Sequence, residues 1–259
     1  MNYAITTSNR PNRELSNLAK NFSTQYNIPF ITREIANEKL KNKEIDFIYV
    51  LDRNNQLKIR FRDSSFFFHP STAKVRRKNI LNGQNDNLLD CMKLKGNELL
   101  LDTTFGLGSE ALLLAHYLER GKVVGLESSL HIYRIVSHGL KYYPFKYKWI
   151  SEATKRIVLL HKNFKQFIRN VASEAYDIVY CDPMFEVPQF RSDSINPLRY
   201  FANYEHLTRE DIDEFMRIAK KRVVLKSRTT DNLFKELNID FSHQRISRNS
   251  GVVYGVIES

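Results

Sequence analysis

Cysteine is scarce in this chain of 259 residues, and no long apolar run interrupts its mixed composition. Two cysteines, Cys91 and Cys181, are too few and too far apart for a disulfide scaffold or a cysteine-ligated zinc site, which favours a reducing compartment. The longest apolar runs, such as Ala111 to Ala115, fall far short of the about 18 residues of a membrane span. The first ten residues are polar and lack the apolar core of a secretion signal. The seven histidines are scattered, without carboxylates at ligand spacing. We therefore expect a cytoplasmic protein with no membrane contact and no metal.

Acidic residues are in deficit: 29 Asp and Glu stand against 40 Lys and Arg, so the formal net charge is +11. A surplus of this size favours an anionic partner, nucleic acid before a membrane surface, but it does not separate RNA from DNA. The hydrophobic content of 42% is enough to bury a core in one large or two unequal domains.

The pattern of the chain changes near residue 85. Residues 1–85 combine an apolar start at Tyr3 to Ile5, a helical pattern from about Asn12 to Tyr26, and strand-like runs at 47–51 and 56–61 around a turn. We interpret them as a small α+β domain that contacts RNA or substrate. The basic stretch Lys74 to Lys78 is either the solvated face of a helix or a contact with nucleic acid. The polar segment 82–87 marks the boundary to a second domain, residues 86–259.

From Asn97 onward, short apolar runs alternate with helical patterns. The predicted strands are 99–101, 123–126, 157–160, 178–180 and 223–225, and the predicted helices are 109–118, 132–142, 164–172 and 209–219. This alternation predicts an α/β fold with a mainly parallel sheet and helices on both faces. Ligands bind such sheets at the carboxyl ends of the strands, so the residues after each run are the candidates for a site.

An acidic residue and a Gly-x-Gly turn follow the first predicted strand and open directly into a helix. The candidate ligand contacts there are Asp102, Thr104, Gly106 and Gly108. The two glycines let the backbone turn tightly and approach a ligand where a Cβ would clash. A turn that only connects strand and helix is the alternative.

Glu127 ends the second predicted strand, 19 residues after Gly108. A carboxylate about 20 residues beyond such a turn can accept hydrogen bonds from both hydroxyls of a ribose. The third glycine of the dinucleotide fingerprint is missing, because Ala111 stands in its place. A nucleoside cofactor without phosphates is therefore favoured, and S-adenosylmethionine (SAM) fits. A surface-exposed Glu127 is the alternative.

Asn163 and Phe164 follow the third predicted strand. A polar side chain and an aromatic ring at this place could contact the edge and the face of an adenine. Asn163 is an equally good candidate for the N-cap of the next helix.

The fourth predicted strand ends in Asp182, Pro183, Met184 and Phe185, which resembles the (Asp/Asn)-Pro-Pro-(Tyr/Phe) motif of methyltransferases that act on exocyclic amines. The lone pair of such an amine is delocalised into the base, so acceptors at its N–H groups are needed to localise it. The carboxylate of Asp182 and the carbonyl of Pro183 can supply them, and Phe185 offers a ring on which a base can stack. A proline that simply terminates the strand is the alternative. The polar segment 186–208 that follows is predicted to form a lid or substrate wall.

Four segments in the same order resemble the RsmJ-type methyltransferases: DTTFGLGSEA from Asp102, GLESS around Glu127, YCDPMF around Asp182, and KRVVLK from Lys221. The resemblance covers roughly residues 95–257. It implies a class I, Rossmann-like fold with a seven-stranded sheet that ends in an antiparallel hairpin, for which 241–246 and 252–257 are the candidates. It also implies SAM-dependent methylation of the exocyclic amine of a guanine in small-subunit ribosomal RNA.

Carried over by position, the resemblance implies cofactor contacts from residues at four strand ends: Ser109, Glu110, Glu127, Ser128, Asn163, Phe164 and Asp182. The chain departs from the family's pattern at Ser109-Glu110, where the family has Arg-Asp, and at Ser227-Arg228, where it has Arg-Pro. We predict transfer of the sulfonium methyl group to an amine, with Asp182 and Pro183 as acceptors. Methylation of DNA adenine or of a small amine, and a non-catalytic RNA-binding protein with the same fold, are the alternatives.

Overall fold

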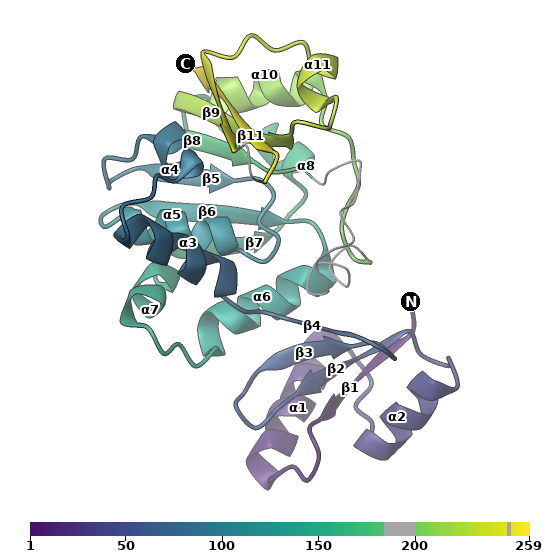
Figure 1. Ribbon diagram of the computed structural model, residues 1–259. Coiled ribbons are helices and arrows are strands. Elements are labelled where there is room, and N and C mark those ends of the chain that lie inside the picture. Colours follow the sequence, from purple (N-terminus) through teal and green to yellow (C-terminus); the bar gives the residue numbers. More distant parts are fainter. Residues whose placement is uncertain (184–199, 248–249) are drawn as a thin grey trace. The chain divides into compact units, whose positions relative to one another are not determined.

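The computed structural model describes residues 1–183, 200–247 and 250–259, which form two compact units (Figure 1). The first unit contains Met1–His69 with Arg134–Lys146, and the second begins at Pro70. The division lies upstream of the boundary expected at residue 86, because helix α3 (Ser71–Leu81) packs against α5 (Ser109–Tyr117) of the second unit. The basic stretch on α3 therefore belongs to the second unit.

A four-stranded sheet in the order β1-β2-β3-β4 is the centre of the first unit. Its strands are β1 (Tyr3–Thr7), β2 (Phe47–Leu51), β3 (Leu57–Arg60) and β4 (Ser65–Phe67), and only the pair β1 and β2 is parallel. Helix α1 (Arg13–Tyr26) begins where Asn12 accepts a hydrogen bond from the backbone N–H of Leu15, and α2 (Arg33–Lys41) is capped by Thr32 in the same way. The α+β character predicted for this part of the chain agrees with these elements.

The second unit is built on a seven-stranded sheet in the order β10-β11-β9-β8-β5-β6-β7 (Figure 1). The strands are β5 (Leu99–Asp102), β6 (Lys122–Glu127), β7 (Ile157–His161), β8 (Tyr176–Cys181), β9 (Ala219–Arg228), β10 (His243–Ser247) and β11 (Val252–Glu258). Strands β5 to β9 pair in parallel, and β11 pairs antiparallel with both β9 and β10. The mainly parallel sheet and its terminal hairpin are confirmed.

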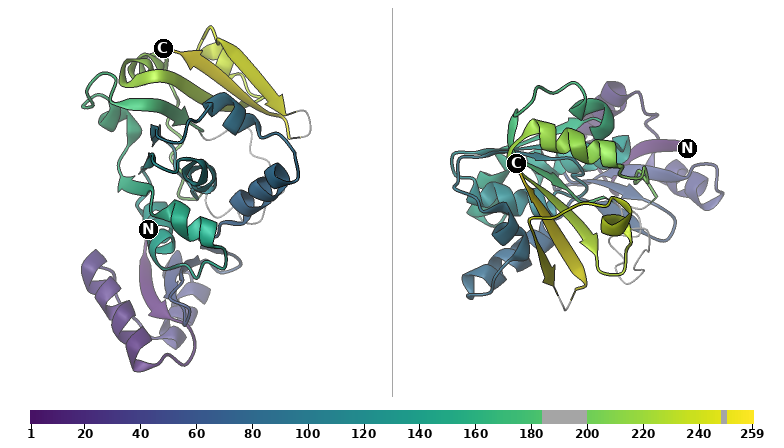
Figure 2. Two further views of the ribbon diagram at one scale, coloured as in Figure 1. Left: turned by 90° about the vertical axis from the view of Figure 1, so that its left-hand side faces the viewer. Right: turned by 90° about the horizontal axis from the view of Figure 1, so that it is seen from above.

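Helices cover both faces of this sheet (Figure 2). Alternate strand residues such as Leu101, Val179 and Leu225 pack on one face against α8 (Phe164–Ile168) and α10 (Arg209–Ile218). The opposite face carries α5, which packs against α3 and α7 (Lys148–Thr154). The remaining helices are α4 (Asn87–Met92), α6 (Leu130–Tyr142), within which the two units divide, and α11 (Leu233–Glu236). None of the helices described is long and apolar enough to cross a membrane.

Candidate active site

Carboxylates end three neighbouring strands of the second unit. Asp102 is the last residue of β5, Glu127 the last of β6, and Asp182 directly follows β8. Strand β5 pairs with both β6 and β8. From β5 the strand order runs through β6 and β7 in one direction and through β8 and β9 in the other, so the topological switch point lies between β5 and β8. The charges of Glu127 and Asp182 act on Asp102 and help to raise its pKa. The three predicted residues thus lie together.

The turn after β5 is held to both neighbouring strands. The hydroxyl of Thr103 donates to the carbonyl of Tyr180, and the hydroxyl of Thr104 accepts the backbone N–H of Asp182 at 2.7 Å. On the other side, the backbone N–H of Phe105 donates to the carbonyl of Leu126 at 2.9 Å. These bonds fix the predicted glycine turn against the ends of β6 and β8.

The two glycines of this turn have different roles. Both have positive φ, +53° at Gly106 and +71° at Gly108, a region that favours glycine. A Cβ on Gly108 would overlap the ring of Phe105, so this glycine is required by packing inside the protein. A Cβ on Gly106 would find its nearest heavy atom at 4.0 Å, which leaves open space beside the backbone. Gly106 is therefore the position at which a ligand could approach.

Glu127 is buried, and its two carboxylate oxygens accept backbone N–H groups. Oε2 accepts from Gly106 at 3.0 Å and Oε1 from Ser129 at 2.7 Å. Burial raises the pKa of Glu127 to about 7, against the opposing effect of these hydrogen bonds. Each oxygen keeps a further lone pair for a ligand hydroxyl. Ser128 follows directly, and its carbonyl lies 3.1 Å from Nε2 of His161.

Asp102 is 1% exposed and accepts a hydrogen bond from the backbone N–H of Thr104 at 3.1 Å. Burial raises the pKa of Asp102 to about 8. Cys181, at the end of β8, faces the core that contains Phe215, and burial raises the pKa of its thiol to about 12. A neutral buried thiol is not a nucleophile.

The polar and aromatic side chains at the third strand end make contacts within the protein. The side chain of Asn163 caps α8 by accepting from the backbone N–H of Lys165 at 2.9 Å, and its Nδ2 donates to Glu205 at 2.8 Å. The ring of Phe164 packs against Phe215, with 5.7 Å between ring centroids. The helix-cap alternative accounts for Asn163 without a ligand.

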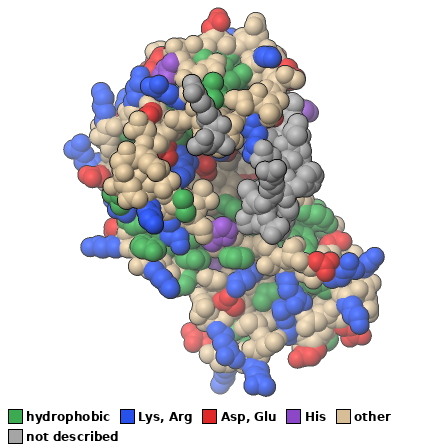
Figure 3. All heavy atoms as spheres, in the orientation of Figure 1, with side chains coloured by type: hydrophobic (Ala, Val, Ile, Leu, Met, Phe, Trp, Pro, Cys, Tyr) green, Lys and Arg blue, Asp and Glu red, His purple; other side chains and the backbone are tan. Residues whose placement is uncertain are grey.

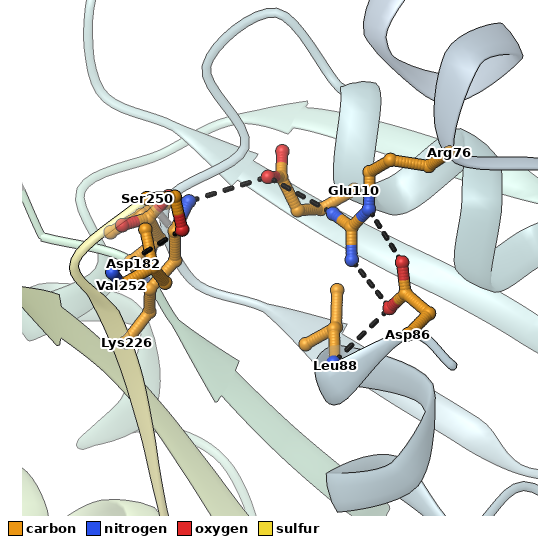
Figure 4. A network of polar contacts seen from close by, with 9 residues as sticks. Arg76, Asp86, Leu88, Glu110, Asp182, Lys226, Ser250 and Val252 are labelled. Atoms are coloured by element: carbon orange, nitrogen blue, oxygen red, sulfur yellow. Dashed lines mark hydrogen bonds and ion pairs between the residues drawn. The ribbon is translucent and has the colours of Figure 1, made fainter. Parts of the chain in front are cut away.

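A row of ion pairs adjoins Asp182, and the sequence analysis did not foresee it (Figure 4). Lys226 of β9 lies with its Nζ 2.6 Å from Oδ2 of Asp182 and 3.3 Å from Oε1 of Glu110. Arg76 of α3 lies 3.4 Å from the same Glu110 oxygen and makes two hydrogen bonds to Asp86, of 2.8 and 2.6 Å. Arg76 is thus committed to the fold rather than free to meet a phosphate, and Lys226 joins the candidate site.

Ser109 and Glu110 open α5, as expected, but Glu110 is engaged by these two cations. Although burial opposes the change, Lys226 and Arg76 lower its pKa. Pro183 is the last described residue of the Asp182 motif. Met184, Phe185 and residues 186–199 of the predicted lid lie outside the described residues. Within the described part of the chain, no group of three His, Cys, Asp or Glu side chains could hold a metal ion.

Comparison with known proteins decides the family. A family described as "Putative SAM-dependent methyltransferase" matches residues 35–249. The chain belongs to this family of SAM-dependent methyltransferases. SAM is accordingly its cofactor. The Bacillus subtilis protein named "Uncharacterized protein YpiP" is 32% identical to this methyltransferase over 98% of the chain and 99% of its own length.

Two further proteins resemble this chain, one in sequence and one in structure. The "Ribosomal RNA small subunit methyltransferase J" of Francisella philomiragia is 25% identical over 78% of this chain and 81% of its own length. The crystal structure of the SAM-dependent methyltransferase NGO1261 from Neisseria gonorrhoeae superposes with a TM-score of 0.65 at 15% identity, covering 98% of this chain and 95% of that one. The second likeness shows the class I, Rossmann-like fold.

The strand ends of this methyltransferase carry three carboxyl groups, those of Asp102, Glu127 and Asp182. In its ionised form a carboxyl group repels phosphates and attracts the sulfonium and ammonium groups of SAM. The remaining lone pairs of Glu127 could accept hydrogen bonds from ribose hydroxyls, and the open side of Gly106 leaves room for a ligand beside the backbone.

Proposed function

We propose that this SAM-dependent methyltransferase transfers a methyl group to the exocyclic amine of a guanine in small-subunit ribosomal RNA. The observation that carries the proposal is Asp182 at the end of β8. Its Oδ2 is held by Lys226, whereas Oδ1 is shielded from solvent and accepts no hydrogen bond from the described residues. A shielded acceptor without a partner costs about 1–3 kcal/mol, so a ligand N–H is the expected partner.

The mechanism follows from these acceptors. When bound, SAM supplies a methyl group on a sulfonium sulfur, which leaves with the electron pair of the S–C bond. Oδ1 of Asp182 and the carbonyl of Pro183 accept N–H groups of the amine and localise its lone pair toward the methyl carbon. Once the N–C bond has formed, the nitrogen releases one proton, for which Oδ1 is a suitable acceptor. Orientation of the amine supplies most of the acceleration, and no covalent enzyme intermediate is needed.

Charge and relatives support RNA as the partner. The net charge is +11, and two relatives carry the name of a ribosomal RNA small subunit methyltransferase. Lys and Arg side chains stand at the surface around α3 and α7 (Figure 3). Lys74 lies over the exposed ring of Tyr147 at 5.6 Å from its centroid, Arg77 lies over Trp149 at 5.1 Å, and Lys78 is exposed. We propose that this face of α3, with the first unit, contacts RNA in the cytoplasm.

Transfer of tritium from labelled SAM tests the proposal, with small ribosomal subunits and naked ribosomal RNA from a strain that lacks the gene. We expect label in a guanine. Asp182→Ala should abolish turnover and weaken SAM binding less than Glu127→Ala does. Label in another base, or in DNA or a small amine added as competing acceptors, would change the substrate. No label on any acceptor, with SAM still bound, would indicate a non-catalytic RNA-binding protein.

A further inference from the structure

The ion pairs beside Asp182 form a continuous row across four elements. From α3 the row runs through Arg76 to Glu110 of α5, then to Lys226 of β9, and ends on Asp182 after β8 (Figure 4). Its members are mostly removed from water: the side chain of Lys226 is 12% exposed, that of Arg76 18%, and those of Asp182 and Glu110 22% and 24%. The row thus connects Asp182, at the end of β8, with helix α3.

Stability alone is a weak reason for such a row. Removing two charges from water costs several kcal/mol per ion, and replacing a buried pair by apolar residues is often neutral or stabilising. The row does have a consequence for geometry, because it ends on one oxygen of one carboxylate. Lys226 occupies Oδ2 of Asp182, and Oδ1 is left shielded and without a partner among the described residues. The two oxygens of a rotating carboxylate would otherwise be equivalent.

We propose that Lys226, itself held by Glu110 and anchored through Arg76, is the positioning residue that orients Asp182 so that Oδ1 receives the amine N–H. The inference rests on the proposed function, since it concerns the acceptor of that reaction. It also changes the expected role of Glu110 from a cofactor contact to the anchor of Lys226. The ammonium has a second effect, because it favours the ionised form of Asp182, the form that accepts hydrogen bonds through both oxygens.

The charged and titratable groups that act on Asp182 come from every element around it. They are Lys226 and Arg228 on β9, Glu110 on α5, Asp102 on β5, Tyr180 on β8 and Tyr254 on β11. Burial raises the pKa of Asp182, and Lys226 opposes the rise. Loss of the ammonium should therefore raise that pKa further, while the other groups remain in place.

The test compares Lys226→Met with Lys226→Arg in single-turnover methyl transfer. We expect Lys226→Met to lower the transfer rate at least tenfold, with the Kd of SAM within threefold of the wild type, and Lys226→Arg to restore part of the rate. The rate of Lys226→Met should recover, relative to wild type, as the pH rises from 6.5 to 8.5. In an Asp182→Asn background, where the acceptor is neutral, Lys226→Met should change the rate and its pH profile by less than twofold.

Lys221→Met is the matched control. Lys221 lies on the same strand and also pairs with two carboxylates, Glu98 at 3.5 Å and Asp177 at 3.1 Å, but away from the carboxyl end of the strand. It should lose stability in urea unfolding without the pH-dependent loss of rate. Equal effects of the two Lys→Met variants on rate and pH profile would reduce Lys226 to a structural residue and overturn the inference.

A second measurement needs no turnover and separates this inference from the proposed function. Titration of the Asp182 carboxyl carbon by ¹³C NMR should show a higher pKa in Lys226→Met than in wild type, and no change in Lys221→Met. An unchanged pKa overturns the positioning role even if guanine is methylated. Conversely, a wild-type protein that methylates no guanine but shows the expected titration contradicts the proposed substrate and leaves the role of Lys226 supported.

Discussion

We predict that Glu127, as the proposed acceptor of the ribose hydroxyls, makes the affinity for SAM depend on pH. Burial raises its pKa to about 7 in the ligand-free protein, and the ionised carboxylate is the stronger acceptor for ribose hydroxyls. If the ionised form binds, the competent fraction falls from about one half at pH 7 to about 1% at pH 5. This loss of the ionised form alone should raise the Kd of SAM about 50-fold between pH 7 and pH 5. The Kd should rise toward pH 5 because Glu127 gains its proton as the pH falls below its pKa of about 7.

Glu127→Gln separates this effect from other titrations. The amide keeps an acceptor oxygen but does not ionise, so the Kd of the variant should be higher at pH 7 and approach that of the wild type at pH 5. We expect the ratio of the two Kd values to shrink by about 50-fold between pH 7 and pH 5, whatever slope other groups impose on both proteins. Isothermal calorimetry at four pH values measures it.

Glu98→Gln is the control for this experiment. Glu98 is also a buried carboxylate, 1% exposed, and accepts backbone N–H groups of Lys95 and Gly96, but it precedes β5 instead of following β6. Its replacement should leave the pH profile of SAM binding unchanged. Parallel profiles of Glu127→Gln and wild type would refute the assignment of Glu127 as the titrating ribose acceptor.

Burial raises the pKa of Asp102 to about 8. Between about pH 4 and pH 8 the native state therefore holds a proton that the unfolded chain has released, so the free energy of unfolding should fall as the pH rises toward 8. Asp102→Asn should reduce that slope by up to ~1.4 kcal/mol per pH unit in urea unfolding, and an unchanged slope would contradict the raised pKa. Gly108→Ala forces a neighbouring ring aside at φ +71° and should cost roughly 1–3 kcal/mol in the same assay. Gly83→Ala is the control, because Gly83 has φ +82° and an added Cβ would meet no heavy atom within 4 Å, so its loss of stability measures the backbone strain alone. An equal loss of stability in the two variants would contradict the overlap of the Gly108 Cβ with the ring of Phe105. Lys74→Gln with Lys78→Gln should weaken RNA binding and reduce its salt slope by about 1.4, with the Kd of SAM unchanged; an unchanged slope would exclude α3 from the RNA contact.

The parallel sheet could be predicted because each buried strand is a short apolar run with a polar residue at its end. The run at Val123 to Leu126 is followed by Glu127, and the run at Ile178 to Tyr180 is followed, after Cys181, by Asp182. Strand ends carry the site in such sheets, so predicting the strands also placed the two carboxylates. The predicted helix at 164–172 is too long, since α8 ends at Ile168.

The division into units was harder to predict because it depends on packing between distant segments. Helix α3 has an apolar pattern too weak to show a buried face, and it is held instead by Ala73 and by the ion pairs of Arg76. The second half of α6 belongs to the first unit, where the ring of Phe68 packs against Gly139 and leaves no room for a side chain. No local sequence signal marks a helix whose two halves pack in different units.

The row of charges at Asp182 was missed for a related reason, although one signal was present. Lys226 continues the apolar run Val223 to Leu225 of a central parallel strand, where a lysine must find an anionic partner or be expelled to solvent. The partner could not be named from the sequence, since Glu110 is 116 residues away and Asp182 is 44 residues away. A charged residue directly after the apolar run of a buried strand, at the edge where ligands bind, therefore points to an oppositely charged group on the neighbouring strand. Here that neighbour is β8, which pairs with β9 up to Cys181 and Leu225, one residue before the two charges meet.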